Sequence, residues 1–183
     1  MAFDVKQAII DRLRATKRKK IETVIDYMIN NGFFVSQCHT HHRYPGGLAD
    51  HAWQTYQVAL RLYAEDCTNN PSTPILDEDS IAIVTLLHDY YRCSGFRYVQ
   101  HKDHGMRSAR ILKLIGFKLP IEEFLAIRFH MRSHSSRNHE LYGDALKNPL
   151  AQLVYRSDRK SASFKNKHED FEAQQGYISW NEV

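Results

Sequence analysis

A histidine and an aspartate stand together at the end of an apolar segment. Residues 81–87 read IAIVTLL and run directly into His88 and Asp89. Imidazole nitrogens and carboxylate oxygens bind metal ions and exchange protons, so this pair has the side chains for chemistry. The alternative is a helix end at which polar residues emerge into water, and one dipeptide does not decide between the two.

Histidines and aspartates occupy the same kind of position at further points of the chain. The residues at or near the apolar stripe of a predicted helix are His51, His88, Asp89, His104, His130 and Asp158. A single histidine in such a position is commonly a satisfied core residue. Buried ionisable groups nevertheless cost free energy unless they are paired or bind a metal. Six of them on five predicted helices therefore indicate one shared centre.

The mixture of neutral imidazole and carboxylate favours a divalent transition metal over Mg or Ca alone. We expect one or two divalent ions, drawn from Mn, Fe, Co, Ni, Zn or Mg. An aspartate beside a histidine can bridge two ions through its two oxygens, and ions about 3.5–4 Å apart can grip phosphoryl oxygens. The pattern thus favours metal-assisted chemistry on a phosphate group.

The elements that must position these side chains are almost all predicted helices. Apolar residues recur at helical spacing along much of the chain. The predicted helices cover residues 3–17, 21–32, 48–66, 77–92, 104–117, 119–134 and 149–164. Pro45 and the glycines after it predict a loop at 33–47, and the polar segment 135–148 is also predicted to be a loop. Almost nothing indicates a strand, so we expect a single all-α domain over 1–183, a bundle of about seven helices.

Composition is that of a soluble globular protein. The chain has 183 residues, of which 43% are hydrophobic and 25% charged, and its net charge of +4 permits a phosphate-bearing partner without requiring one. No apolar run spans a membrane and the N-terminus is not a secretory signal, so we expect no membrane partner. Cys38, Cys67 and Cys93 form no CxxC pair, which indicates a reducing compartment and a cytoplasmic protein.

The order of the predicted ligands resembles the HD-domain superfamily of metal-dependent phosphohydrolases. Five segments carry the resemblance in sequence order: HHRYPGGLADH, LLHDYYR, KDHGMRSARIL, LAIRFHM and PLAQLVYRSDRKSA. They are similar to segments of one subgroup that includes 3′–5′ exoribonucleases and small bacterial and phage hydrolases. The resemblance covers residues 27–164, which would form the HD-like hydrolase core, with an N-terminal helix in 1–26 and a peripheral tail at 165–183.

The resemblance implies roles for each predicted ligand. The implied ligands of a first ion are His51, His88, Asp89 and Asp158. The implied second-ion histidines are His104 and His130, with Asp89 bridging the two ions as the catalytic carboxylate. His134 follows His130 by four residues, so it could replace His130 as the ligand, contact substrate, or be a plain surface histidine.

Two further positions bear on substrate binding. The family often has lysine where this chain has Arg92, which keeps the charge and binds phosphate through two parallel hydrogen bonds but cannot donate a proton. We expect Arg92 to hold a substrate phosphate; the alternative is that it caps the end of its helix. The resemblance also extends over His41 and His42, which could contact substrate phosphate or serve to fix the loop.

The implied function is hydrolysis of a phosphomonoester or phosphodiester by metal-activated hydroxide, and we expect the substrate to be a nucleotide. A first alternative is a 3′–5′ exonuclease acting on single-stranded nucleic acid, although no OB-type β domain precedes the hydrolase part. A second is a catalytically silent regulatory or binding module, although all six predicted ligands are retained. The sequence contains no P-loop, dinucleotide-binding or GxSxG motif that would indicate another class of enzyme. It does not identify the substrate or the oligomeric state.

Overall fold

The computed structural model describes residues 3–94, 104–132 and 137–164. Within these ranges the chain forms eight α-helices and one 3-10 helix, without a strand, which confirms the prediction of an all-α bundle of about seven helices. The helices are α1 (Val5–Ala15), α2 (Ile21–Asn30), α3 (Gly47–Asn69), α4 (Glu78–Leu87), η1 (Tyr90–Ser94), α5 (His104–Leu114), α6 (Ile121–Phe129), α7 (Tyr142–Lys147) and α8 (Pro149–Phe164). None of the described helices is long and apolar enough to cross a membrane.

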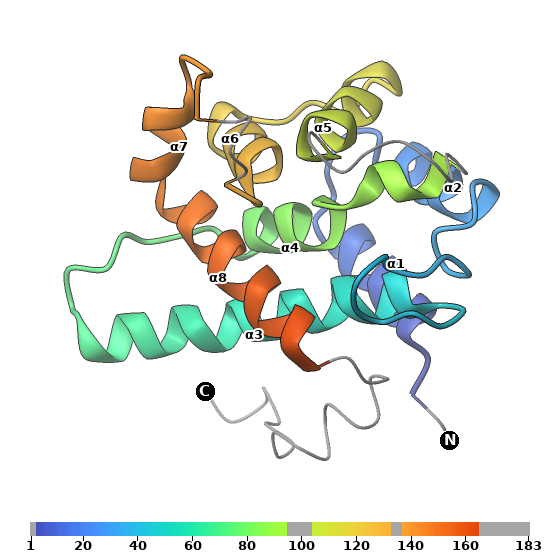
Figure 1. Cartoon of the computed structure of the whole chain (residues 1–183), viewed down its shortest axis with the longest axis horizontal. Coiled ribbons are helices and arrows are strands. Elements are labelled where there is room, and N and C mark those ends of the chain that lie inside the picture. The colour runs from blue at the N-terminus through green and yellow to red at the C-terminus, as the bar shows by residue number, and fades with distance from the viewer. Residues whose placement is uncertain (1–2, 95–103, 133–136, 165–183) are drawn as a thin grey trace.

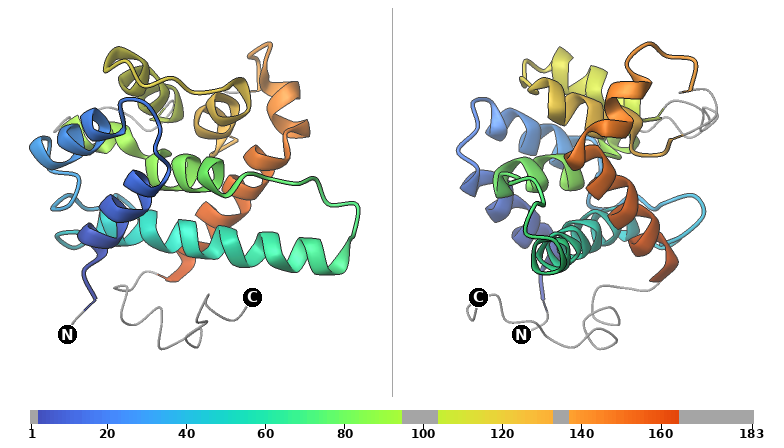
Figure 2. Two further views of the ribbon diagram at one scale, coloured as in Figure 1. Left: turned by 180° about the vertical axis from the view of Figure 1, so that it is seen from behind. Right: turned by 90° about the vertical axis from the view of Figure 1, so that its left-hand side faces the viewer.

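Helix α4 is the centre of the bundle (Figure 1). It begins where the Asp77 side chain accepts a hydrogen bond from the backbone N–H of Ser80, at 2.8 Å, and every residue from Ile81 to Leu87 is buried. The helix packs against α3, α6 and α8, and α8 crosses over α3 in the views of Figures 1 and 2. Because α4 is enclosed in this way, the residue that follows Leu87 lies in the interior rather than in water.

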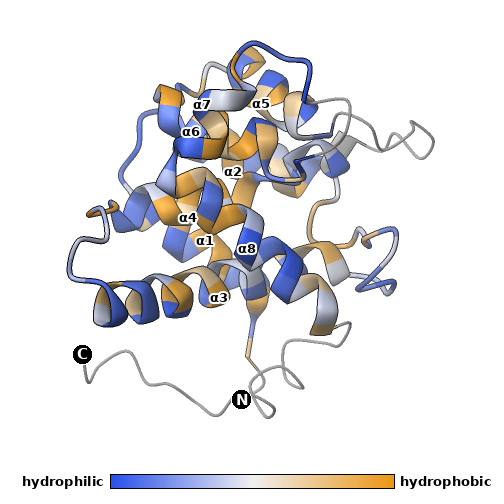
Figure 3. Ribbon diagram, turned by 60° about the vertical axis from the view of Figure 1, so that its left-hand side comes forward, coloured by the Kyte–Doolittle hydropathy of each residue, from blue (hydrophilic) through white to orange (hydrophobic). Residues whose placement is uncertain are grey.

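The apolar faces of the other helices turn toward α4, as the hydropathy colouring of Figure 3 shows. Helices α1 and α2 cover one side, where Leu13 and Met28 are fully buried. Tyr90 of η1 is also fully buried, and its hydroxyl donates a 2.8 Å hydrogen bond to the backbone oxygen of Val24 in α2. This contact fixes the chain just after the His88–Asp89 dipeptide.

Three predicted elements are wrong in their extent. The helix predicted over 119–134 is present as α6, which ends at Phe129. The helix predicted over 77–92 ends at Leu87, and the chain continues as the tighter η1. The segment 135–148, predicted as a loop, contains the six-residue α7, whose Ala145 packs with Leu125 and Phe129 of α6. Tertiary packing thus stabilises a helix too short to leave a periodic pattern in the sequence. The tail predicted over 165–183 lies outside the described residues.

Candidate metal centre

The structure brings all six of the predicted ligands into one buried cluster. The side chains come from α3, the end of α4, the start of α5, the end of α6, and α8: His51, His88, Asp89, His104, His130 and Asp158. Each is at most 6% exposed. Potential ligand atoms lie within 4.8 Å of one another in three overlapping groups: His51–His88–Asp89, His88–His130–Asp158 and Asp89–His104–His130. These groups could hold a metal ion, and Asp89 belongs to two of them.

One half of the cluster is built from α3, α4 and α8. His51 Nε2 lies 3.3 Å from His88 Nε2 and 3.1 Å from Asp158 Oδ1. His88 Nε2 lies 3.7 Å from the same Asp158 oxygen. Two imidazole nitrogens and a carboxylate oxygen therefore converge on one point.

The other half is built from α5 and α6 around Asp89. His104 Nε2 and His130 Nε2 are 2.9 Å apart, and they lie 3.6 and 3.8 Å from Asp89 Oδ1. This oxygen is buried and accepts no hydrogen bond from the part of the chain that the structure describes. A buried carboxylate oxygen without a donor is costly, which makes it a strong candidate for a metal ligand.

The backbone fixes the tautomers of two of the histidines. His88 and His130 each follow the last residue of a helix, and in each the Nδ1 lies 2.7–2.8 Å from the carbonyl oxygen three residues earlier, that of Thr85 and Ile127. A carbonyl oxygen only accepts, so Nδ1 carries the hydrogen and Nε2 of the neutral ring carries the lone pair. The position of each residue at a helix end thus presents Nε2 as a ligand atom.

A pair of hydroxyls lies against the other ring nitrogen of His51. The Thr55 hydroxyl donates to the His51 carbonyl oxygen at 2.7 Å, and the Ser161 hydroxyl is directed at the Asp158 carbonyl oxygen at 3.0 Å. The Ser161 oxygen lies 3.1 Å from His51 Nδ1 and 2.7 Å from the Thr55 oxygen. Metal ligation through Nε2 would place the hydrogen of His51 on Nδ1, where the Ser161 oxygen is within reach as its acceptor.

The protonation states suit a cation as well. Burial, followed by the neighbouring His104 and His88, lowers the pKa of His130 to about 3, so this ring is neutral near pH 7. Burial alone would raise the pKa of Asp89, but Arg92 and the surrounding histidines outweigh it and hold that pKa well below its usual range. The pKa of Asp158 is likewise held low against burial by His51 and His88. Neutral imidazoles and ionised carboxylates are the states in which these groups bind metal.

The approach of α5 to α6 depends on Gly105, a residue that the sequence analysis did not single out. A Cβ at this position would lie 2.5 Å from the backbone oxygens of Ile127 and Arg128. Only glycine permits this approach, and it places the adjacent His104 beside His130. The signal in the sequence was a glycine directly after a predicted ligand.

Arg92 contacts the cluster through Asp89. Its Nε donates a 2.8 Å hydrogen bond to Asp89 Oδ2, and its side chain is 15% exposed. The helix predicted over 77–92 would place Arg92 one turn beyond His88, but α4 ends at Leu87 and the tighter turn of η1 brings Arg92 back over the carboxylate. The two oxygens of Asp89 thus divide their contacts: Oδ2 is held by arginine and Oδ1 faces the histidines.

Of the other predicted substrate contacts, His42 is 1% exposed and has both ring nitrogens engaged. Its Nε2 lies 2.8 Å from Gln54 Oε1 and its Nδ1 lies 2.9 Å from His41 Nδ1. These contacts favour the alternative in which His42 fixes the loop. His134 lies outside the described residues.

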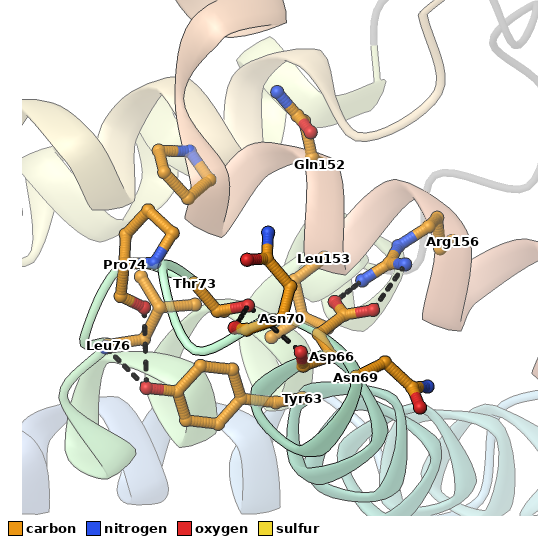
Figure 4. A pocket seen from close by; sticks show the side chains of 11 residues that line it. Tyr63, Asp66, Asn69, Asn70, Thr73, Pro74, Leu76, Gln152, Leu153 and Arg156 are labelled. Atoms are coloured by element: carbon orange, nitrogen blue, oxygen red, sulfur yellow. Dashed lines mark hydrogen bonds and ion pairs between the residues drawn. The ribbon is translucent and has the colours of Figure 1, made fainter.

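A surface hollow of about 260 Å³ lies between the C-terminal part of α3, residues 70–76 and α8 (Figure 4). Arg156 pairs with Asp66 on its wall, and the Tyr63 hydroxyl accepts a 2.8 Å hydrogen bond from the backbone N–H of Leu76. None of the six clustered side chains lines it. The hollow therefore reflects how the 70–76 connection is fastened to the bundle, and it is separate from the candidate centre.

Comparison with known proteins adds no assignment. The sequence matches no protein-family model, no curated protein and no solved structure. The candidate centre is therefore interpreted from its own geometry.

Proposed function

We propose that the chain is a metal-dependent phosphohydrolase that cleaves a phosphomonoester or phosphodiester, with a nucleotide as the substrate class. The observation that carries this proposal is the convergence of potential ligand atoms around a buried carboxylate oxygen that has no hydrogen-bond donor among the described residues. His51 Nε2 faces His88 Nε2, His104 Nε2 faces His130 Nε2, and the buried Asp89 Oδ1 lies beside the second pair. Asp89 Oδ1 is buried and accepts no hydrogen bond from the described residues, and a cation among these nitrogens would satisfy it.

The residues present fit two divalent ions. One ion would be held by His51, His88 and Asp158, whose potential ligand atoms lie 3.1–3.7 Å apart. The other would be held by His104 and His130, and Asp89 groups with the histidines of both halves. Nitrogen and carboxylate ligands together suit Mn, Fe, Co, Ni or Zn, with Mg a weaker candidate. When bound, such ions supply Lewis acidity: they lower the pKa of a coordinated water and neutralise negative charge on phosphoryl oxygens.

The charge of the site supports an anionic substrate. The imidazole of His130 is neutral and the two carboxylates are ionised, so two divalent ions would outweigh the negative charge of the ligands. Arg92 adds a further permanent positive charge next to Asp89. A centre with net positive charge in a largely dry interior stabilises the negative charge of a phosphate ester.

Each of the chain's own groups has a defined task in this proposal. Arg92 holds Oδ2 of Asp89, which leaves Oδ1 directed at His104 and His130. The backbone oxygens of Thr85 and Ile127 hold His88 and His130 in the tautomer that ligation requires. The site is therefore preorganised by bonds within the protein, which lowers the reorganisation that binding costs.

A substrate panel tests the proposal. The full chain would be assayed with Mn, Co, Ni, Mg and Fe on nucleoside monophosphates, cyclic nucleotides and short single-stranded oligonucleotides. We expect metal-dependent release of phosphate or nucleotide that EDTA abolishes. The isosteric Asp89→Asn variant should lose at least about a hundredfold in rate, and Asp66→Asn, whose carboxylate pairs with Arg156 away from the cluster, should retain full activity.

Each outcome bears on the proposal. Release of mononucleotides from oligonucleotides alone would assign the exonuclease alternative within the same chemistry. The proposal fails if no substrate turns over with any of the metals, or if Asp89→Asn is as active as the wild-type chain.

A further inference from the structure

The loop before α3 folds back on the first turn of that helix. Gly46 has φ +86° and His42 has φ +46°, so two residues of the loop adopt the left-handed conformation. A Cβ at Gly47 would lie 2.0 Å from the His42 carbonyl oxygen. The backbone of His42 therefore lies directly on the start of α3, one turn before His51, and a non-glycine residue holds an unfavourable conformation to remain there.

This folding places His41 against the first half of the cluster. The ring centroids of His41 and His51 are 4.4 Å apart. Potential ligand atoms of His41, His42 and His51 lie within 4.8 Å of one another. His42 is buried and both of its nitrogens are hydrogen-bonded, whereas His41 is half-buried and only its Nδ1 is bonded among the described residues.

A chain of three hydrogen bonding groups fixes the tautomer of His41. Gln54 Oε1 is an acceptor, so His42 Nε2 carries a hydrogen and donates to it. The neutral His42 ring then has its lone pair on Nδ1, which accepts from His41 Nδ1–H at 2.9 Å. The hydrogen of His41 is consequently on Nδ1, and the remaining lone pair of this ring is on Nε2.

We propose that His41 supplies Nε2 as an additional nitrogen ligand to the ion held by His51 and His88, and that His42 and Gln54 are positioning residues for it. This inference rests on the proposed metal centre and extends its ligand set beyond the six residues that the sequence pattern indicates. It explains why an imidazole with a fixed tautomer is buried against a ligand, and why the loop keeps a strained His42. The ion that His41 would bind is the one proposed for His51 and His88, and it is drawn from the same divalent, nitrogen-binding metals.

The test measures binding of Co²⁺ by calorimetry and by the visible spectrum, without reference to activity. His41→Ala should weaken Co²⁺ binding at His51 and His88 by at least about tenfold, because losing even a residue that only hydrogen-bonds to a metal ligand costs about that much affinity. It should also change the visible bands, since the ligand field loses a nitrogen. Added imidazole should restore affinity to His41→Ala, which a role limited to loop packing would not allow.

Two further variants separate ligation from loop structure. His39→Ala changes an exposed histidine of the same loop and should bind Co²⁺ as the wild-type chain does. Gln54→Leu removes the acceptor of His42 Nε2 and should weaken Co²⁺ binding less than His41→Ala does. Circular dichroism would show that the helices are retained in all three.

The outcomes distinguish this inference from the proposed function. If the wild-type chain binds Co²⁺ and His41→Ala binds it with the same affinity and spectrum, the additional ligand is overturned and the six-residue centre stands. If weakened binding in His41→Ala is not restored by imidazole, His41 is a packing residue and the inference is likewise overturned. If the wild-type chain binds no Co²⁺, the metal centre and this inference fall together.

Discussion

Replacing Gly105 by alanine tests the link between helix packing and the second half of the cluster. The added Cβ would lie 2.5 Å from the backbone oxygens of Ile127 and Arg128, about 1 Å closer than an ordinary van der Waals contact. Backbone atoms cannot rotate away as a side chain can, so α5 must move from α6 by roughly this distance. The movement carries His104 away from His130.

The magnitude follows from two opposing effects. Overpacking of this kind lowers the free energy of unfolding by about 1–3 kcal/mol. The better helix propensity of alanine offsets up to about 1 kcal/mol of this loss. We expect the free energy of unfolding to fall by about 1–2 kcal/mol. Gly143→Ala is the matched control, because a Cβ there meets nothing within 4 Å, and it should be neutral or slightly stabilising.

Urea unfolding followed by circular dichroism measures the stability of both variants, and Co²⁺ calorimetry measures the centre. In Gly105→Ala, Co²⁺ binding at His104 and His130 should weaken, whereas the ion at His51 and His88 should remain. Unchanged stability together with an unchanged binding isotherm would refute the argument that Gly105 sets the distance between His104 and His130.

Two ion pairs give further predictions. Arg18→Ala leaves Glu123, which is 1% exposed, without its bidentate partner, so the free energy of unfolding should fall by about 2–3 kcal/mol. The control Arg14→Ala breaks a surface pair and should change the free energy of unfolding little. Equal effects of the two variants in urea unfolding would contradict the argument from burial. Arg92→Ala removes the charge-assisted hydrogen bond to Asp89 and should cost about 1.5–3 kcal/mol in EDTA. Added Co²⁺ should recover part of the lost melting temperature, because a cation replaces the lost positive charge; an unchanged melting curve in EDTA would contradict this role.

The helices were predictable wherever a face of the helix is apolar over several turns. The predicted bounds 149–164 coincide with α8, and the all-α class follows from the same periodicity. The end of α4 was not predictable, because the sequence from Ile81 to Arg92 has no proline or glycine to stop a helix. The burial of Tyr90 against α2 decides that the chain turns there, and this contact spans 66 residues.

The convergence of the six polar side chains was also predictable, since each lies beside an apolar stripe and the stripes share one core. The tautomers were not, because they depend on the exact ends of α4 and α6, at which His88 and His130 reach the backbone oxygens of the preceding turn. The position of His41 depends on left-handed residues in a loop, a conformation that residue types alone leave undetermined at His42.

Metal stoichiometry is the most direct test of the central claim that the buried cluster is a metal centre. The 183-residue chain, stripped with chelator, would be dialysed against Mn²⁺ or Co²⁺ beside the isosteric Asp158→Asn variant, and bound metal would be measured per folded chain. The wild-type chain should retain one or two ions, and Asp158→Asn should lose the ion at His51 and His88 while keeping its helical circular dichroism. Wild-type protein that is folded and retains no stoichiometric metal, or an Asp158→Asn variant that retains as much as the wild-type chain, would contradict the account.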